Sequence, residues 1–189
     1  IEAGTFMIAA AATQGNVVIN NVIPAHLEAI SAKLMECGVE VIEGDNGNDF
    51  YMQIISNSRP RAVNIKTLPY PGFPTDLQSL YLAAAMTLEG KSCICENVFE
   101  DRLRTAEELQ KMGGTLQICG KWLTAEKSRL HGAEVVSQDL RGGAALVSAA
   151  LAAEGFSTIR QTELIERGYE RFPETLRELG AKIIVEKEI

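Results

Sequence analysis

The sequence has few of the side chains that proteins use to hold metals or to build disulfide frameworks. Its 189 residues include two histidines and four cysteines, and no two cysteines have the C-x-x-C spacing of a zinc site or a redox turn. The cysteines are Cys37, Cys93, Cys95 and Cys119. We therefore expect reduced structural thiols and no metal held by the protein.

Positive charge and long apolar runs are also scarce. Lys and Arg number 18 against 25 Asp and Glu, for a net charge of −7, which argues against nonspecific binding to nucleic acid or acidic lipid. A few local arginines can still hold an anionic substrate. The longest apolar runs, such as 80–88, fall short of the roughly 20 residues that cross a bilayer. We expect a cytoplasmic protein with no secretory signal and no nucleic-acid or membrane partner.

Apolar residues make up 46% of the chain, and a three-fold repeat organises them. The length suits one sizeable core rather than two large ones. Three apolar helical runs each lead to a glycine, which can take the left-handed conformation that ends a helix. The runs and their glycines are 5–12 with Gly15, 77–88 with Gly90, and 144–153 with Gly155. Since these helices are apolar nearly all round, we expect them to be buried on most sides.

Each buried helix is followed by a short strand, an amphipathic helix that stops at a glycine, and a pair of strands. The glycines are Gly38, Gly113 and Gly180, and the strand pairs begin at 39–42, 115–118 and 182–185. The repeat units span about 1–56, 57–126 and 127–189. The first unit lacks the strand expected before its helix, and the chain opens at Ile1 inside a helical pattern. We therefore expect a single domain, 1–189, excised from a longer protein, with its N-terminal strands and a second domain missing.

Four sequence blocks point to a known family. They are 71–78 (PGFPTDLQ), 96–102 (ENVFEDR), 139–141 (DLR) and 167–170 (RGYE). Together with the three βαβαββ-type units they resemble, in order and over essentially the whole chain, one domain of the enolpyruvyl transferases in their UDP-N-acetylglucosamine branch. The resemblance implies an α/β fold, an inside-out α/β prism with buried helices. The branch that uses shikimate 3-phosphate shares the fold but not these blocks.

The resemblance also implies a reaction and its partners. The enolpyruvyl group of phosphoenolpyruvate would move to the 3-hydroxyl of UDP-N-acetylglucosamine with release of phosphate, as the first committed step of peptidoglycan synthesis, with no metal or organic cofactor. The family's loop cysteine or aspartate, a lysine and further arginines would lie in the missing upstream part. We therefore assign none of the four cysteines to catalysis and expect the isolated chain to be inactive. The alternative is a noncatalytic UDP-sugar-binding or regulatory homologue.

Asp76 is the candidate general base. It follows a rigid Pro-Gly-Phe-Pro loop at the start of a buried helix. From the residues alone, its carboxylate either favours the helix start, where partial positive charge gathers, or faces a substrate hydroxyl. The resemblance implies the second, with Asp76 contacting the sugar hydroxyl and removing its proton.

The other candidates would bind substrate or organise charge. Arg167 either pairs on the surface or grips the phosphate or carboxylate of phosphoenolpyruvate with its planar guanidinium. Asp139 and Arg141 open the third buried helix, where charges are unusual unless they pair or face a cleft. The resemblance places Asp139, Arg141 and Arg167 around phosphoenolpyruvate. It assigns substrate contacts to Val98 and Phe99, Val98 through its main chain, and Arg102 is a further candidate.

Five positions depart from the family pattern. Gly142-Gly143 stands where Ala-Ser is commoner, Asp101 where Asn is, Leu164 where His is, and Glu166 where Asp is usual. These departures concern the phosphoenolpyruvate end of the site more than the sugar end.

Overall fold

The computed structural model describes residues 1–99 and 104–186, and its elements follow the order that the repeat predicts up to the last helix of the third unit. The helices are α1 (Glu2–Ala12), α2 (Glu28–Glu36), α3 (Gln78–Ala85), α4 (Arg104–Lys111), α5 (Leu140–Ala152), α6 (Glu163–Glu166) and α7 (Phe172–Glu178), with 3₁₀ turns η1 (Pro24–His26) and η2 (Thr75–Leu77). The strands are β1 (Asn16–Val22), β2 (Glu40–Asp45), β3 (Phe50–Ile55), β4 (Ile65–Lys66), β5 (Lys91–Cys95), β6 (Thr115–Cys119), β7 (Trp122–Glu126), β8 (Glu134–Val136) and β9 (Thr158–Arg160).

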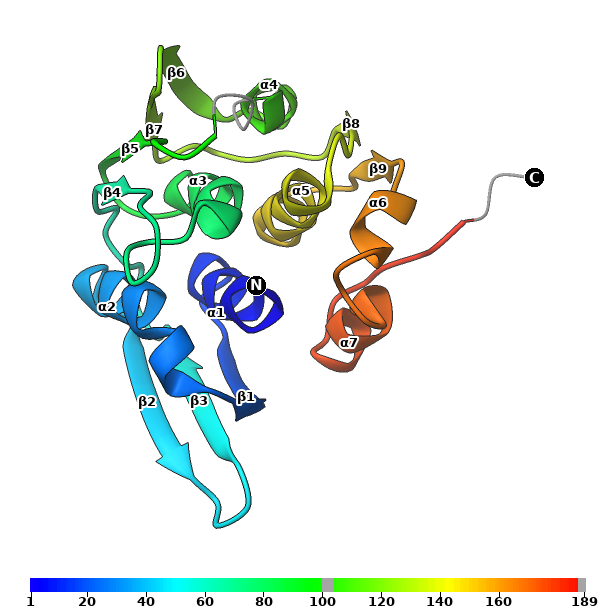
Figure 1. The fold of residues 1–189 in the computed structure, drawn as a ribbon. Helices are drawn as coiled ribbons and strands as arrows, with labels where there is room; N and C mark the ends of the chain where they lie inside the picture. The colour runs from blue at the N-terminus through cyan, green and yellow to red at the C-terminus, as the bar shows by residue number, and fades with distance from the viewer. Residues whose placement is uncertain (100–103, 187–189) are drawn as a thin grey trace.

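Helices α1, α3 and α5 pack against one another at the centre, and the sheets lie outside them (Figure 1). Every residue of α3 is buried, as the all-round apolar pattern predicts. Small buried side chains in these helices, such as Ala83 and Ala145, favour a close approach of the helix axes. Larger side chains, among them Met7, Leu80 and Leu146, fill the space that remains.

The amphipathic helices α2, α4 and α7 lie outside the central three (Figure 1). Each buries apolar side chains that its periodicity predicts: Ile30 and Leu34 in α2, Leu109 in α4, Phe172 and Leu176 in α7. Leu179, expected to continue the α7 stripe, lies just past the end of the helix and is exposed. The predicted inside-out α/β architecture is therefore confirmed.

The second repeat unit has the complete βαβαββ order. Its sheet has the strand order β4-β5-β7-β6, and β4 pairs parallel with β5 through the crossover helix α3. The third unit repeats this crossover, since β8 pairs parallel with β9 around α5. In the first unit the order is β1-β3-β2. Within the described residues β1 has a neighbour on one edge only, so this unit lacks the strand that β4 supplies in the second.

The glycines that follow the helices fulfil their predicted role with one exception. Gly38, Gly90, Gly113, Gly155 and Gly180 all have positive φ angles. After α1, however, Gln14 takes the left-handed conformation, with φ 56°, and Gly15 does not. The turn after the first buried helix therefore ends one residue earlier than the glycine pattern indicates.

The predicted strand at 182–185 is wrong. These residues are extended but belong to no strand, and the Ile184 side chain is 85% exposed. A strand is defined by hydrogen bonds to a neighbouring strand, and no strand within the described part of the chain lies beside this segment. An apolar segment with strand-like composition therefore does not by itself predict a strand at 182–185.

Gly132 marks a close approach of two backbones. Its N–H donates to the Glu154 carbonyl oxygen at 2.7 Å, just beyond α5. A Cβ placed on Gly132 would lie 2.0 Å from the Phe156 carbonyl oxygen. Backbone atoms cannot rotate away as a side chain can, so this position requires glycine.

We expect Gly132→Ala to lower the free energy of unfolding by about 1–3 kcal/mol, because the added methyl group overpacks the contact. The matched control is Gly15→Ala, whose Cβ would meet its nearest neighbours at 3.5 Å and 3.6 Å. The control should stay within about 0.5 kcal/mol of the unchanged chain. Urea denaturation of both variants measures the difference, and equal losses would contradict the close-approach argument.

Candidate functional site

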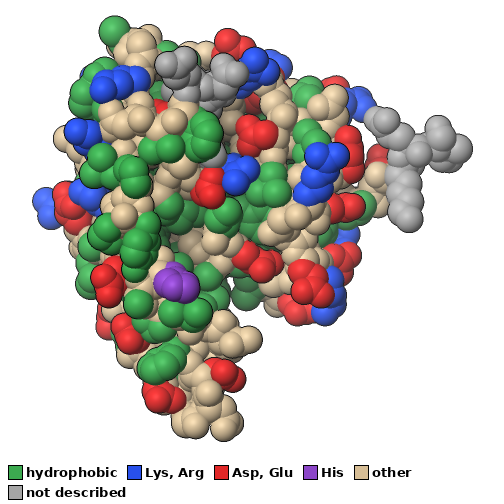
Figure 2. Space-filling view, viewed as in Figure 1, with side chains coloured by type: hydrophobic (Ala, Val, Ile, Leu, Met, Phe, Trp, Pro, Cys, Tyr) green, Lys and Arg blue, Asp and Glu red, His purple; other side chains and the backbone are tan. Residues whose placement is uncertain are grey.

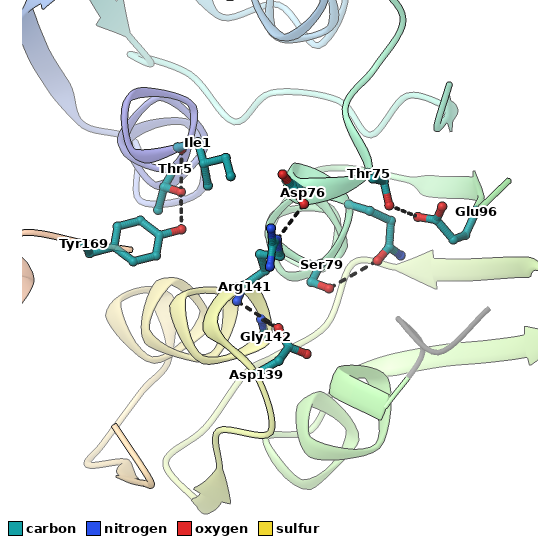
Figure 3. A network of polar contacts seen from close by, with 11 residues as sticks. Ile1, Thr5, Thr75, Asp76, Ser79, Glu96, Asp139, Arg141, Gly142 and Tyr169 are labelled. Atoms are coloured by element: carbon teal, nitrogen blue, oxygen red, sulfur yellow. Dashed lines mark hydrogen bonds and ion pairs between the residues drawn. The ribbon is translucent and has the colours of Figure 1, made fainter. Parts of the chain in front are cut away.

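The first residues of the three central helices meet at one end of the structure (Figure 3). Gly4 of α1 faces Leu77 of η2, since a Cβ on Gly4 would lie 2.6 Å from Leu77 Cδ1. The side chain of Arg141, in the first turn of α5, reaches Asp76 of η2. Helix N-termini present unpaired N–H groups and a partial positive charge. This end of the molecule therefore favours anionic groups.

Asp76 and Arg141 form an ion pair at this end. Arg141 Nε donates to Asp76 Oδ1 at 2.6 Å, and the two side chains are about a third exposed, 33% for Arg141 and 28% for Asp76. Asp76 does not cap α3, because Leu77 occupies the N-cap position and no side chain caps there. The pair therefore places a carboxylate and a guanidinium at the surface of the helix convergence rather than within a helix cap.

A cavity of about 150 Å³ opens beside Asp76. Its walls come from the start of α1, from η1 and the start of α2, and from the Pro-Gly-Phe-Pro loop. Among the lining residues are Ile1, Gly4, His26, Tyr70 and Pro71. Most of this wall is apolar, and Asp76 supplies carboxylate oxygens to it.

Asp139 has a structural role in α5. Its Oδ1 accepts hydrogen bonds from the backbone N–H groups of Arg141 and Gly142, both at 2.8 Å, so it is the N-cap of the helix. The cap fixes the first turn of α5 and with it the position from which Arg141 extends to Asp76 (Figure 3).

The Gly142-Gly143 departure has a packing explanation. A Cβ on Gly142 would lie 2.4 Å from Thr105 Oγ1, and one on Gly143 would lie 2.3 Å from Ser137 Oγ and 2.6 Å from Ile165 Cγ1. Side chains of α4, α6 and the segment before α5 therefore occupy the space that Ala and Ser would need.

Val98 and Phe99 lie in the loop after β5, with side chains 39% and 53% exposed. Their N–H groups donate to the Glu96 carboxylate at 2.8 Å and 3.1 Å. The Val98 N–H is thus already engaged within the chain. Arg102 and Asp101 fall outside the described residues.

Arg167 lies directly after α6, is exposed, and has no ion-pair partner within the described part of the chain. The structure does not bring it into contact with the Asp76–Arg141 pair. Two residues later Tyr169 is buried, and its hydroxyl shares a 2.8 Å hydrogen bond with Thr5 Oγ1 of α1. Burial raises the pKa of Tyr169. This contact, with the ring of Tyr169 against Phe172, ties the Arg167 segment to the start of α1.

Residues that the sequence patterns did not indicate hold the site together. Thr5 and Tyr169 join the first and third units, and Thr75 and Glu96 join η2 to the loop after β5. Glu96, Tyr169 and Thr75 all lie inside the four family-like blocks, so their position in these blocks was the one sequence feature that could have indicated them. Which residue each one contacts is decided by segments far away in the sequence.

Within the described residues we find no second candidate site built on a metal cluster or on an activated cysteine. No group of three or more His, Cys, Asp or Glu side chains in these ranges could hold a metal ion. Cys37 is buried, and desolvation raises the pKa of its thiol, which disfavours the nucleophilic thiolate. No helix in the described part is long and apolar enough to cross a membrane.

The capping role of Asp139 can be separated from its charge. Asp139→Ala should lower the free energy of unfolding by about 1 kcal/mol, because two N–H groups lose their acceptor. Asp139→Asn keeps an acceptor oxygen and should lose less than half as much. Denaturant unfolding of the two variants gives both values, and equal losses would show that the cap is not what Asp139 contributes.

Comparison with known proteins identifies the family. Residues 1–176 match the family model of EPSP synthase (3-phosphoshikimate 1-carboxyvinyltransferase). A UDP-N-acetylglucosamine 1-carboxyvinyltransferase of Desulfofundulus thermocisternus is 49% identical over 97% of this chain and 74% of its own length. UDP-N-acetylglucosamine 1-carboxyvinyltransferase 3 of Symbiobacterium thermophilum is 48% identical over the whole chain, which spans 44% of that relative.

Solved structures agree on the fold. The enolpyruvyl transferase NikO from Streptomyces tendae superposes with a TM-score of 0.78 at 27% identity, covering 96% of this chain and 42% of NikO. EPSP synthase from Acinetobacter baumannii gives a TM-score of 0.81 at 22% identity, covering 98% of this chain and 46% of that one, and supports the fold alone. The chain therefore belongs to the EPSP synthase (3-phosphoshikimate 1-carboxyvinyltransferase) family, in which its curated relatives are UDP-N-acetylglucosamine 1-carboxyvinyltransferases.

Proposed function

We propose that this chain forms one side of the active site of a UDP-N-acetylglucosamine 1-carboxyvinyltransferase. The enzyme would transfer the enolpyruvyl group of phosphoenolpyruvate to the 3-hydroxyl of UDP-N-acetylglucosamine, releasing phosphate, as a cytoplasmic step of peptidoglycan synthesis. The observation that carries the proposal is the Asp76–Arg141 ion pair where the central helices begin. The pair places a carboxylate that can accept a proton at the helix N-termini, where partial positive charge favours anionic groups.

The roles follow from the chemistry of the reaction. Asp76 accepts the proton of the sugar 3-hydroxyl while the oxygen of that hydroxyl bonds to C2 of phosphoenolpyruvate. At the same time an acid protonates the C3 methylene. Loss of that C3 proton and of phosphate then gives the enol ether. Arg141 and Arg167 bind the phosphate and carboxylate, with Asp139 holding Arg141 in place through the helix cap. Val98 and Phe99 contact the UDP-sugar, and Arg102 is a further candidate ligand.

We propose that the rest of the site comes from a second domain outside these 189 residues. The cavity beside Asp76 holds about 150 Å³, whereas small-molecule sites usually enclose roughly 300–1,000 Å³. A UDP-sugar would therefore need further walls. The chain spans less than half of the Symbiobacterium relative, which leaves room for them. The second domain would supply the catalytic acid, a lysine and further arginines, and the isolated chain would be inactive.

Phosphate release by the complete protein tests this proposal. We expect release with phosphoenolpyruvate and UDP-N-acetylglucosamine, and none when shikimate 3-phosphate replaces the UDP-sugar. Asp76→Ala should lower kcat by about 10²–10⁴-fold, the range for loss of a general base. The matched control is Asp49→Ala, which removes an exposed carboxylate from the β2–β3 hairpin and should leave kcat unchanged.

Other outcomes would point elsewhere. Release with shikimate 3-phosphate would assign the protein to the other branch of the family. A folded complete protein that binds the UDP-sugar but releases no phosphate would be the noncatalytic homologue.

A further inference from the structure

Glu96 is a buried carboxylate to which the proposed reaction gives no role. It follows β5 directly and is 4% exposed. Burying a carboxylate is costly unless hydrogen bonds replace the lost water. Glu96 accepts four such bonds from described residues, two from hydroxyl groups and two from backbone N–H groups. A carboxylate so fully engaged fixes the groups around it.

The two oxygens of Glu96 hold different parts of the site. Oε1 accepts from the N–H of Val98 at 2.8 Å and of Phe99 at 3.1 Å. Oε2 accepts from Thr75 Oγ1 at 3.0 Å, and Thr75 directly precedes Asp76 (Figure 3). One rigid, planar group therefore joins the Val98–Phe99 loop to the turn that carries Asp76.

Thr67 reinforces this junction from within the sheet. Its hydroxyl donates to Glu96 Oε1 at 2.8 Å and accepts from the Asn97 N–H at 2.9 Å. The Asn97 amide nitrogen in turn donates to the Thr67 carbonyl oxygen at 3.1 Å. Thr67 is fully buried and Glu96 nearly so, and through them the end of β4, the loop after β5 and η2 share one hydrogen-bonded network.

The junction lies on a surface with apolar side chains exposed. Val98, Phe99, Leu68 and Tyr70 are all exposed near the loops that Glu96 and Thr67 connect. Hydrophobic side chains also gather on the face of the molecule seen in Figure 2. A loop that presents apolar side chains to solvent has little packing of its own, so its backbone position depends on internal hydrogen bonds.

We propose that Glu96 is a positioning residue that sets the distance between the loop contacting the UDP-sugar and the carboxylate of Asp76. This inference rests on the proposed function. Oε1 fixes the loop, and Oε2 fixes Thr75 and hence the orientation of Asp76 toward the sugar 3-hydroxyl. A proton transfer needs its donor and acceptor within hydrogen-bond reach, and small misplacements are costly.

The Thr75 arm can be cut separately in the complete protein. Thr75→Val keeps the shape of the side chain but removes the donor to Oε2. We expect kcat to fall about 10- to 100-fold while KM for UDP-N-acetylglucosamine stays within about twofold, since the loop arm is intact. Thr75→Ser should restore kcat because it returns the hydroxyl. Thr87→Val is the matched control, losing one hydroxyl beyond the other end of α3, and should match the unchanged enzyme.

Amide hydrogen exchange tests the role of Glu96 directly, and this measurement does not depend on enzymatic activity. Glu96→Met keeps the length of the side chain without an acceptor, so the Val98 and Phe99 amides should exchange at least about tenfold faster while the β5 amides do not change. Glu96→Gln should behave nearly as the unchanged protein, since its oxygen can face the loop and its NH₂ can donate to Thr75. That result would assign the role to geometry rather than charge.

The outcomes separate the two proposals. Thr75→Val kinetics equal to those of the unchanged enzyme, or Thr75→Ser as slow as Thr75→Val, would overturn the positioning role. So would unchanged exchange of the Val98 and Phe99 amides in Glu96→Met. An unchanged complete protein that releases no phosphate would instead count against the proposed function, and the exchange measurement would then decide the Glu96 junction by itself.

Discussion

The structure depends on three helices that have no polar face. α1, α3 and α5 can lie only where apolar side chains surround them, so they pack on one another and the sheets and amphipathic helices lie outside (Figure 1). The hydrophobic effect places them there because exposing any side of such a helix would leave apolar area in water. The sheets and the amphipathic helices together shield the three central helices from water.

The same packing creates the candidate site. Because the parallel crossovers repeat, the central helices begin at the same end, and their N-terminal N–H groups gather there. The Asp76–Arg141 pair and the Asp139 cap lie at these helix starts, where neighbouring dipoles favour negative charge. A fold driven by apolar burial thus provides a polar, anion-favouring end.

Buried hydrogen bonds add the precision that apolar packing does not give. The Glu96 junction and the Thr5–Tyr169 contact each join segments from different parts of the chain. Such bonds contribute modestly to net stability, but leaving one partner unsatisfied in the interior is costly, so they select one arrangement of the loops. The Tyr169 contact lies near the Arg167 segment and the Glu96 junction lies next to Asp76, so both act close to the candidate ligands.

The sequence by itself determined the repeat, the three buried helices, the amphipathic helices and the order of elements in the first two units, because periodicity states which faces are apolar. It also identified the enolpyruvyl transferase family, and its blocks named Asp76, Asp139 and Arg141 as candidates. Only the tertiary structure decided that Arg141 reaches Asp76 across 65 positions, that Asp139 caps α5, that Thr75 meets Glu96, and that 182–185 is no strand. Local patterns describe what each segment needs, whereas a hydrogen bond or a strand also requires a partner whose position only the folded chain defines.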